Sequence, residues 1–339
     1  MHPELSLDTS LRDFNTFGID ARASHYLRVT SIDALRAALA DPVLAALPRL
    51  VLGGGSNIVL TGDFKGLVLH MAIMGKQVLA DSPLGTALVR AGAGESWHGL
   101  VDYTIAQGLG GLENLALIPG TVGASPIQNI GAYGVEIKDV FHSVTVLDGE
   151  TVRTMTAKEC RFAYRDSIFK QPDGAGLIVL DVTYALPRAW QPVLGYAELA
   201  NAVREAGLDA PTPRQIADLV IAIRRRKLPD PAVIGNAGSF FKNPVVSAAR
   251  CAAILAVHPT LVHHAQADGS VKLAAGWLID QCGWKGRSMG AAGVYPKQAL
   301  VLVNQGGATG ADVVALARAI AADVMARFGV ALETEPVFV

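Results

Sequence analysis

Cysteine is scarce in this sequence. Among 339 residues there are only three, Cys160, Cys251 and Cys282, and they lie far apart. This spacing fits neither a disulfide framework nor a CxxC metal pair. We therefore expect free thiols, no metal site and a reducing compartment, the cytoplasm.

The sequence also has no excess of acidic or basic residues and no long apolar run. The 29 basic and 30 acidic side chains leave a net charge of -1, so no field attracts nucleic acid or anionic lipid. No window reaches the about 18 uncharged apolar residues of a spanning helix, and the N-terminus does not resemble a signal peptide. We expect a soluble protein of two or three domains that binds neither nucleic acid nor membrane.

Several common site motifs are absent. The chain contains neither G-x-G-x-x-G nor G-x-x-x-x-G-K-[ST], which argues against an ordinary Rossmann domain or P-loop. Ser239 is not in a G-x-S-x-G elbow, so a serine hydrolase is disfavoured. His263 and His264 are neighbours that would point to opposite faces of a strand, so we expect surface histidines.

The strand signals do not follow a regular βαβ rhythm. Residues 49–52 (RLVL) predict a short buried strand, and 177–186 (LIVLDVTYAL) predict an alternating one. Between them, 143–155 (SVTVLDGETVRTM) predict a hairpin in which Asp148 and Gly149 supply the two positive-φ positions of a type I′ turn. We expect a mixed α+β fold.

Two helices are well marked. Thr212, Pro213 and Gln215 predict a capped start, with an apolar stripe formed by Ile216, Leu219, Val220 and Ile223. This helix ends in the basic run 224–227, which either complements the helix dipole or contacts a phosphate. The last helix starts at Thr309 with Asp312 three residues on, stops at Gly329, and buries Val313, Leu316, Ile320, Val324 and Phe328.

Two glycine-rich loops could hold a dinucleotide. The first glycine-rich loop, 53–57 (GGGSN), follows a predicted strand, and glycine lets backbone N–H groups approach a pyrophosphate closely. The second glycine-rich loop, 117–134 (LIPGTVGASPIQNIGAYG), offers a similar polar backbone. Two such loops without a Rossmann motif point to a flavin, although each alone is more often a tight turn.

The stretch 235–244 (GNAGSFFKNP) places Ser239 after two glycines. It can be a simple turn, because Gly and Asn supply unusual backbone angles there. It can also be a flexible backbone that holds a reactive hydroxyl in place.

Five motifs in order carry a family resemblance: GGGSN, PGTVGASPIQNIGAYG, CRFAYRDSIFK, GNAGSFFKNP and YPKQALVLVN. With them the chain resembles the UDP-N-acetylenolpyruvoylglucosamine reductase family, from Asn15 to the final LETE. The resemblance implies an α+β fold with an FAD-binding region of the vanillyl-alcohol oxidase (PCMH) type. It implies two flavin-gripping subdomains in 17–188, divided near residue 75, an α+β substrate-binding region in 189–330, and a tail, 331–339, that carries an active-site acid.

The resemblance also implies the reaction. NADPH would reduce FAD, and the reduced flavin would reduce the enolpyruvyl ether of UDP-N-acetylglucosamine to UDP-N-acetylmuramate, in peptidoglycan precursor synthesis. Ser239 matches the family's proton donor, Arg165 its active-site arginine and Glu335 its third catalytic residue. Pro336, directly after Glu335, departs from the family pattern and weakens that last assignment.

Ligand contacts carry over in the same way. The residues matching the family's flavin site are Gly53, Gly54, Gly55, Ser56, Asn57, Ile127, Gly131 and Arg224. Those matching its substrate site are Tyr196, in the mobile loop of one subgroup, and Lys227, Asn243 and Gln298. No histidine occurs in the first glycine-rich loop, so we expect noncovalent FAD. We also expect a monomer.

Two other readings of the sequence stay open. Another flavoprotein of this fold, acting on a 2-hydroxy acid, would share the glycine-rich loops. A nonenzymatic protein that binds a nucleotide sugar could keep the fold without turnover.

Overall fold

The computed structural model describes residues 4–82 and 85–339. The chain forms two compact units, and each is built from separate segments. Unit 1 comprises Met1–Thr9, Ala23–Gly54 and Lys65–Arg226, and unit 2 comprises Ser10–Arg22, Gly55–Phe64 and Lys227–Val339. The continuous domains expected from the sequence, 17–188, 189–330 and 331–339, remain a prediction.

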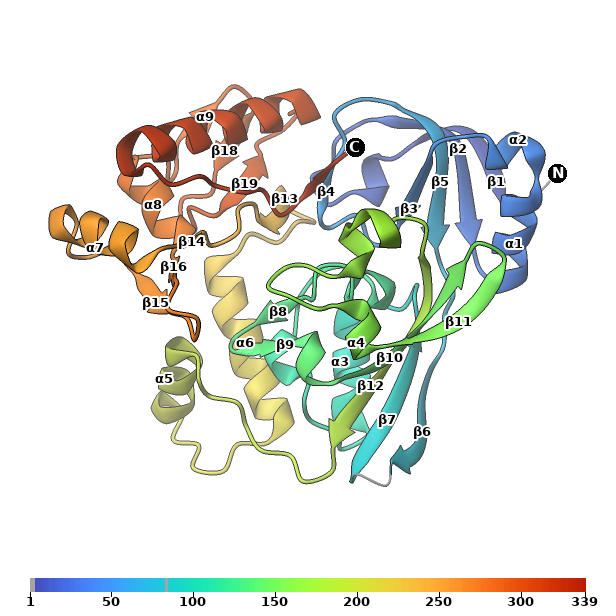
Figure 1. Cartoon of the computed structure of the whole chain (residues 1–339), viewed down its shortest axis with the longest axis horizontal. Helices are drawn as coiled ribbons and strands as arrows, with labels where there is room; N and C mark the ends of the chain where they lie inside the picture. Colours follow the sequence, from blue (N-terminus) through green and yellow to red (C-terminus); the bar gives the residue numbers. More distant parts are fainter. Residues whose placement is uncertain (1–3, 83–84) are drawn as a thin grey trace. The chain divides into compact units, whose positions relative to one another are not determined.

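The described residues of unit 1 form two larger sheets and one small one (Figure 1). The first has the order β1-β2-β5-β3, and its strands are Leu5–Ser10, Arg22–Val29, Phe64–Met71 and Arg49–Leu52. The second has the order β11-β10-β12-β7-β6, and its strands are Thr151–Thr156, Phe141–Asp148, Ile178–Pro187, Thr86–Gly92 and Lys76–Ser82. The small sheet pairs β8 (Gly131–Ala132) with β9 (Val135–Glu136).

The predicted hairpin forms, but its turn differs from the prediction. β10 and β11 are antiparallel and Asp148 pairs with Thr151, so the two central turn residues are Gly149 and Glu150. Of these only Gly149 has positive φ, 59°. The type I′ turn was therefore wrong, because Asp148 completes the strand and a single glycine supplies the left-handed position.

The other two predicted strands differ in burial from their patterns. β3 is an edge strand on which only Leu52 is buried, because the sheet ends there. β12 is the central strand of its sheet, and most of its residues are buried rather than alternate ones. Its position, and not its hydrophobic period, decides its burial.

Helices complete the core of unit 1. Thr212 and Gln215 form the predicted capping contacts at 2.9 and 3.3 Å, and α6 buries Ile216, Val220 and Ile223, while Leu219 is half-buried. α3 contributes Trp97, whose ring meets Tyr184 of β12 edge to face. The helices of this unit are α1 (Ile32–Ala40), α2 (Pro42–Ala45), α3 (Trp97–Ala106), α4 (Ala157–Cys160), α5 (Ala197–Glu205) and α6 (Pro213–Lys227).

Unit 2 is built around α9 (Gly310–Phe328), which packs on β18 and β19. Its predicted capping box is present at Thr309 and Asp312, its predicted buried stripe is buried, and Gly329 ends it with φ 58°. The sheets have the orders β13-β19-β18-β17, β14-β16-β15 and β20-β4. The remaining elements are β4 (Ile58–Val59), β13 (Gly235–Ser239), β14 (Val245–Val246), α7 (Ala248–Val257), β15 (His263–Ala265), β16 (Val271–Leu273), α8 (Ala275–Gln281), β17 (Ser288–Met289), β18 (Ala292–Val294), β19 (Val301–Asn304) and β20 (Val337–Phe338).

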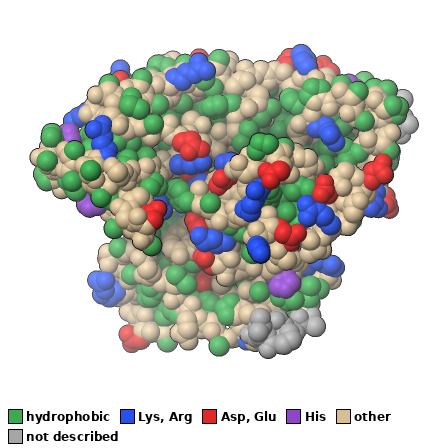
Figure 2. Space-filling model, in the orientation of Figure 1, with side chains coloured by type: hydrophobic (Ala, Val, Ile, Leu, Met, Phe, Trp, Pro, Cys, Tyr) green, Lys and Arg blue, Asp and Glu red, His purple; other side chains and the backbone are tan. Residues whose placement is uncertain are grey.

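The surface and the cysteines agree with the composition. On the face seen in Figure 2, Lys and Arg side chains are interspersed with Asp and Glu. Cys160, Cys251 and Cys282 are free thiols. Within 4–82 and 85–339, no helix is long and apolar enough to cross a membrane, and no group of three or more His, Cys, Asp and Glu side chains could hold a metal. His263 and His264 are both exposed.

Candidate active site

Within unit 1 the two glycine-rich loops approach each other at backbone distance. A Cβ on Gly54 would lie 2.9 Å from the Cα of Gly120, and a Cβ on Gly53 would lie 2.3 Å from Oγ1 of Thr121. Carbon atoms in contact normally stay about 3.5–4.0 Å apart. Only glycine therefore permits this approach.

The place where Gly53 and Gly54 meet Gly120 and Thr121 is called the cradle. Thr121 gives this cradle an unpaired polar group. Its Oγ1 is buried and has no hydrogen-bond partner among the described residues. The backbone on either side is fixed, because Trp97 N–H donates to Gly120 O at 3.1 Å and Val122 N–H donates to Glu95 O at 2.8 Å. An unpaired buried hydroxyl costs about 1–3 kcal/mol. The cradle thus fits a cofactor that brings polar oxygen atoms, such as the pyrophosphate of FAD. The sequence analysis did not single out Thr121, although a hydroxyl directly after Pro119 and Gly120 was the available signal.

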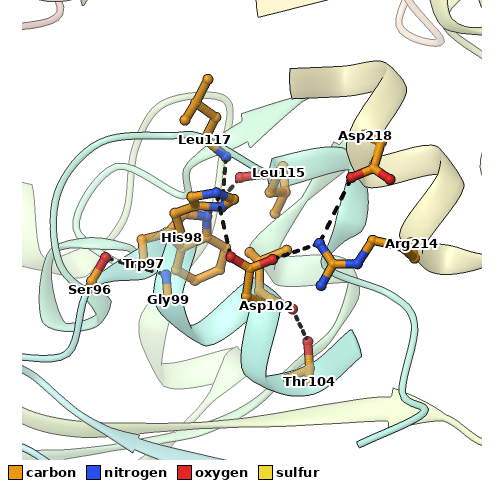
Figure 3. Close-up of polar contacts among 11 residues, drawn as sticks. Ser96, Trp97, His98, Gly99, Asp102, Thr104, Leu115, Leu117, Arg214 and Asp218 are labelled. Atoms are coloured by element: carbon orange, nitrogen blue, oxygen red, sulfur yellow. Dashed lines mark hydrogen bonds and ion pairs between the residues drawn. The ribbon is translucent and has the colours of Figure 1, made fainter. Parts of the chain in front are cut away.

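The start of the second glycine-rich loop is fixed by a histidine on α3 (Figure 3). Leu117 has φ 59°, which is unfavourable for a residue with a side chain, and its N–H donates to Nδ1 of His98 at 3.2 Å. Nε2 of His98 faces Asp102 at 3.6 Å, and Asp102 pairs with Arg214 of α6 at 2.8 Å. His98 therefore connects the strained loop residue to two helices. His98 was not among the residues predicted from the sequence.

Arg165 lies in a strained tight turn. Ala163 and Asp166 exchange backbone hydrogen bonds of 3.0 and 3.3 Å, and Arg165, between them, has φ 55°. For a residue with a Cβ the left-handed region costs about 1–2 kcal/mol. Such strain is often found at functional residues, because the surrounding structure must maintain it.

The Arg165 turn is tied to two residues predicted to line the flavin. The Arg165 guanidinium donates to Gly131 O at 2.8 Å and lies 3.8 Å from the carboxylate of Glu136. Ser167 Oγ donates to Ile127 O at 2.6 Å. Unit 1 therefore brings Arg165, Ile127 and Gly131 together. The guanidinium also lies 5.2 Å from the centroid of the Tyr164 ring, so it packs beside an aromatic side chain.

Tyr133 is a neighbour of two further predicted residues. Its ring meets the ring of Tyr196 edge to face, with centroids 5.2 Å apart. Burial raises the pKa of Tyr133 to about 12, and the charge of Arg224 opposes this shift. Burial lowers the pKa of Arg224, whose Nε is buried without a hydrogen-bond partner among the described residues. A buried cation with an unused donor suits an anionic ligand. Tyr133, itself at φ 49°, was missed by the sequence analysis.

Ser239 stands at the end of β13 in unit 2, where the strand is irregular. The pairing with β19 shifts register between Asn236 and Ser239, and Gly238 has φ 68°. Asn236 is buried, and its Oδ1 accepts the Gly238 N–H at 2.9 Å. Ser239 is exposed, whereas Phe240 directly after it is buried. The irregularity thus presents the hydroxyl while the aromatic side chain anchors the strand.

The C-terminal tail brings Glu335 next to Ser239. Glu335 N–H donates to Phe240 O at 2.9 Å, and Asn57 Nδ2 donates to Glu335 O at 3.2 Å. Pro336 is buried and lies between two backbone pairings, since Val337 N–H donates to Asn57 O at 3.0 Å and starts β20. At Pro336 the tail passes from Phe240 to Asn57 as its backbone hydrogen-bond partner, so the N–H that proline lacks is not needed there. The unusual proline is therefore compatible with a fixed Glu335.

The remaining predicted residues also lie in unit 2. Asn243 Oδ1 accepts the N–H of Ala275 at the start of α8 at 3.0 Å, and Gln298 Oε1 accepts the N–H of Leu300 at 3.3 Å. Their amide nitrogens donate to no group among the described residues, so they can contact a ligand. Lys227 is the last residue of α6. Gly55 and Ser56 begin the unit 2 part of the first glycine-rich loop, and Gly55 has φ 59°.

Known proteins match this chain over most of its length. Residues 23–155 match the family model of an FAD binding domain, and 230–339 match that of the UDP-N-acetylenolpyruvoylglucosamine reductase C-terminal domain. A UDP-N-acetylenolpyruvoylglucosamine reductase of Azoarcus sp. (strain BH72) is 57% identical over 99% of this chain and 98% of its own length. One from Cupriavidus pinatubonensis (strain JMP 134 / LMG 1197) is 60% identical over 96% of this chain and 97% of its own length.

A solved structure shares the fold. The crystal structure of UDP-N-acetylenolpyruvylglucosamine reductase (MurB) from Thermus caldophilus superposes with a TM-score of 0.69 at 26% identity, covering 99% of this chain and 98% of that one. The expected α+β class and FAD-binding fold are confirmed. This chain belongs to the UDP-N-acetylenolpyruvoylglucosamine reductase family.

Proposed function

We propose that this protein reduces the enolpyruvyl ether of UDP-N-acetylenolpyruvoylglucosamine to UDP-N-acetylmuramate, with NADPH as reductant. Two relatives that carry the name of this reductase match the chain over 98% and 97% of their own length. FAD, held by the two glycine-rich loops, would supply the hydride chemistry. The tasks left to the chain are to bind both groups, to stabilise the charge that develops and to deliver one proton.

Ser239 delivers the proton. Negative charge develops on the carbon next to the carboxylate, and a hydroxyl held against that carbon can protonate it. A serine is a weak acid, so it needs fixed geometry and support for its emerging alkoxide. The Asn236–Gly238 hydrogen bond and the buried Phe240 supply the fixed geometry.

Arg165 stabilises the substrate carboxylate as it gains enolate character. A guanidinium stays charged at all relevant pH values and offers a planar pair of donors. The left-handed backbone of Arg165 and its bond to Gly131 O hold this group beside the predicted flavin residues.

The single observation that carries the pairing of Ser239 with Glu335 is the hydrogen bond from Glu335 N–H to Phe240 O. It joins the last acid of the chain to the residue after Ser239, although they are far apart in the sequence. Two residues with expected catalytic roles thereby lie close together in unit 2. Glu335 then accepts or relays hydrogen bonds next to the proton donor.

Oxidation of NADPH that depends on UDP-N-acetylenolpyruvoylglucosamine tests the proposal. We expect the purified protein to show a bound-flavin absorption spectrum and to form UDP-N-acetylmuramate, identified by mass spectrometry. A flavin spectrum without substrate-dependent turnover would indicate another flavoprotein oxidoreductase. A colourless protein that binds the nucleotide sugar would indicate a binding protein.

We further propose that the protein works in the cytoplasm as a monomer. The three free thiols suit a reducing compartment. Light scattering of the purified protein and fractionation of cells that express it at native levels test these two points. A stable dimer, or recovery outside the cytoplasm, would overturn them.

A further inference from the structure

The segment that carries Tyr196 has no secondary structure of its own. β12 ends at Pro187 and α5 begins at Ala197, and the residues between them form neither helix nor strand. Tyr196 is exposed, and a Cβ on Gly195 would meet nothing within 4 Å. Contacts from elsewhere in unit 1 must therefore determine where this tyrosine lies.

The first such contact holds Trp190. Its Nε1–H donates to the carboxylate of Glu113 at 2.8 Å, and its ring lies on Gly110, where a Cβ would come within 2.3 Å of the indole. Glu113 is 1% exposed, and its second oxygen accepts the N–H of Gly111 at 2.5 Å. A buried carboxylate is costly unless each oxygen is hydrogen-bonded. Trp190 is thus fixed by a strong pairing.

The second contact comes from the next residue, Asn114, which is fully buried. Its amide nitrogen donates one hydrogen to Val193 O at 2.9 Å and the other to Tyr133 O at 2.8 Å. One side chain therefore joins the Tyr196 segment to the second glycine-rich loop. Its Oδ1 has no partner among the described residues, so the side chain is kept there by its two donors.

The result is a defined position for Tyr196. Its ring packs on Tyr133, and a Cβ on Gly134 would lie 3.7 Å from Val193 Cγ1 and 3.8 Å from Tyr196 N. Both segments are in van der Waals contact. Between the hydrogen-bonded Val193 and Tyr196 lie only Leu194, which packs partly buried against the core, and Gly195.

We propose that Gly110, Glu113 and Asn114 form a loop anchor that positions Tyr196 for the sugar nucleotide. They are positioning residues, since they act through Trp190 and Val193. The inference rests on the proposed function, in which Tyr196 contacts the substrate. It predicts that the anchor controls substrate affinity and leaves reduction of the flavin by NADPH unchanged.

The test measures two quantities on the flavin-loaded full chain: the KM for the sugar nucleotide and the rate of flavin reduction by NADPH. Gly110→Ala displaces Trp190, and Asn114→Asp keeps the side-chain shape but removes both donors. For each we expect the KM for UDP-N-acetylenolpyruvoylglucosamine to rise about tenfold, as for the loss of one hydrogen bond or more, with the rate of flavin reduction by NADPH within twofold. Gly176→Ala is the matched control, because a Cβ there meets nothing within 4 Å; we expect no change.

Fluorine NMR of protein labelled with 5-fluorotryptophan adds a readout that needs no turnover. The chain has four tryptophans, and Trp190→Phe assigns the Trp190 resonance. We expect this resonance to shift in Asn114→Asp and to stay in place in Gly176→Ala. An unshifted Trp190 resonance, an unchanged KM in both anchor variants, or equal losses in both half-reactions would overturn the anchor. If the wild type fails to consume the sugar nucleotide, the proposed function fails, while the resonance still reports on the anchor.

Discussion

Gly54→Ala should weaken FAD binding because it forces the two glycine-rich loops apart. The new Cβ would lie 2.9 Å from Gly120 Cα, 3.4 Å from its carbonyl carbon and 3.6 Å from its nitrogen. These are backbone atoms, so no side chain can rotate away. The loops must separate by several tenths of an ångström, and overpacking of this kind costs about 1–3 kcal/mol.

Affinity and stability should respond differently to this substitution. If this free-energy cost appears as weaker FAD binding, the dissociation constant of FAD rises roughly 5- to 150-fold, since about 1.4 kcal/mol is a factor of ten. The free energy of unfolding of the flavin-free protein should change less. Alanine lowers the conformational entropy of the unfolded chain, and this raises the free energy of unfolding by about 0.4–1 kcal/mol. A large loss of affinity with a small loss of stability is therefore the expected signature.

The assay is titration of flavin-free protein with FAD, followed by quenching of flavin fluorescence, together with urea unfolding of the same preparation. Gly62→Ala is the matched control, because a Cβ there meets nothing within 4 Å and its φ is not positive. An FAD affinity of Gly54→Ala within twofold of the wild type would refute the cradle. Equal weakening in Gly62→Ala would refute the explanation by loop separation.

Three further changes probe other parts of the structure. Ser239→Ala should leave reduction of the flavin by NADPH intact and slow its reoxidation by substrate by roughly two or more decades; stopped-flow measurement of each half-reaction checks this, and equal losses would make Ser239 structural. Arg165→Lys should slow only the second half-reaction, because an ammonium cannot replace the bidentate fork; unchanged reoxidation contradicts the role. Burial raises the pKa of Tyr184 above its ordinary value of 10.0, so the folded state keeps a proton that the unfolded state loses, and stability present below pH 10 is lost as the pH rises further. Tyr184→Phe should make the alkaline fall in unfolding free energy shallower by up to about 1.4 kcal/mol per pH unit, and urea titrations across that range measure it.

Local signals were sufficient for much of the fold. The capping contacts at Thr212 and Thr309 form as expected, because each depends on side chains three residues apart. The hairpin also formed as expected, because its two strands and turn are consecutive in the sequence, but its turn type depended on which residue completed the strand. β3 was misjudged because a pattern of apolar residues cannot show whether a strand lies at an edge of a sheet.

The site depended on contacts between distant segments, so the sequence could supply it only through the family resemblance. The role of Thr121 depends on its close contact with Gly53, and the role of Asn114 on its hydrogen bond to Val193 O. The same holds for Pro336, which looked unfavourable from the sequence and proves compatible because the tail changes partners there. The importance of such residues depends on tertiary contacts, which a local sequence signal alone does not reveal.

The backbone of Arg165 allows a matched test of function against stability. Arg165→Gly and Arg165→Ala remove the same guanidinium and its hydrogen bond to Gly131 O, so both should lose substrate reduction to the same extent. They differ only at φ 55°, where glycine is unstrained and alanine carries a Cβ. Arg165→Gly should therefore be more stable than Arg165→Ala by about 1 kcal/mol, measured by urea unfolding of the two proteins. Because glycine also makes the unfolded chain more flexible, an ordinary position would show the opposite order. If Arg165→Ala proves the more stable, the turn is not strained, and the argument that function maintains an unfavourable backbone at this residue is wrong.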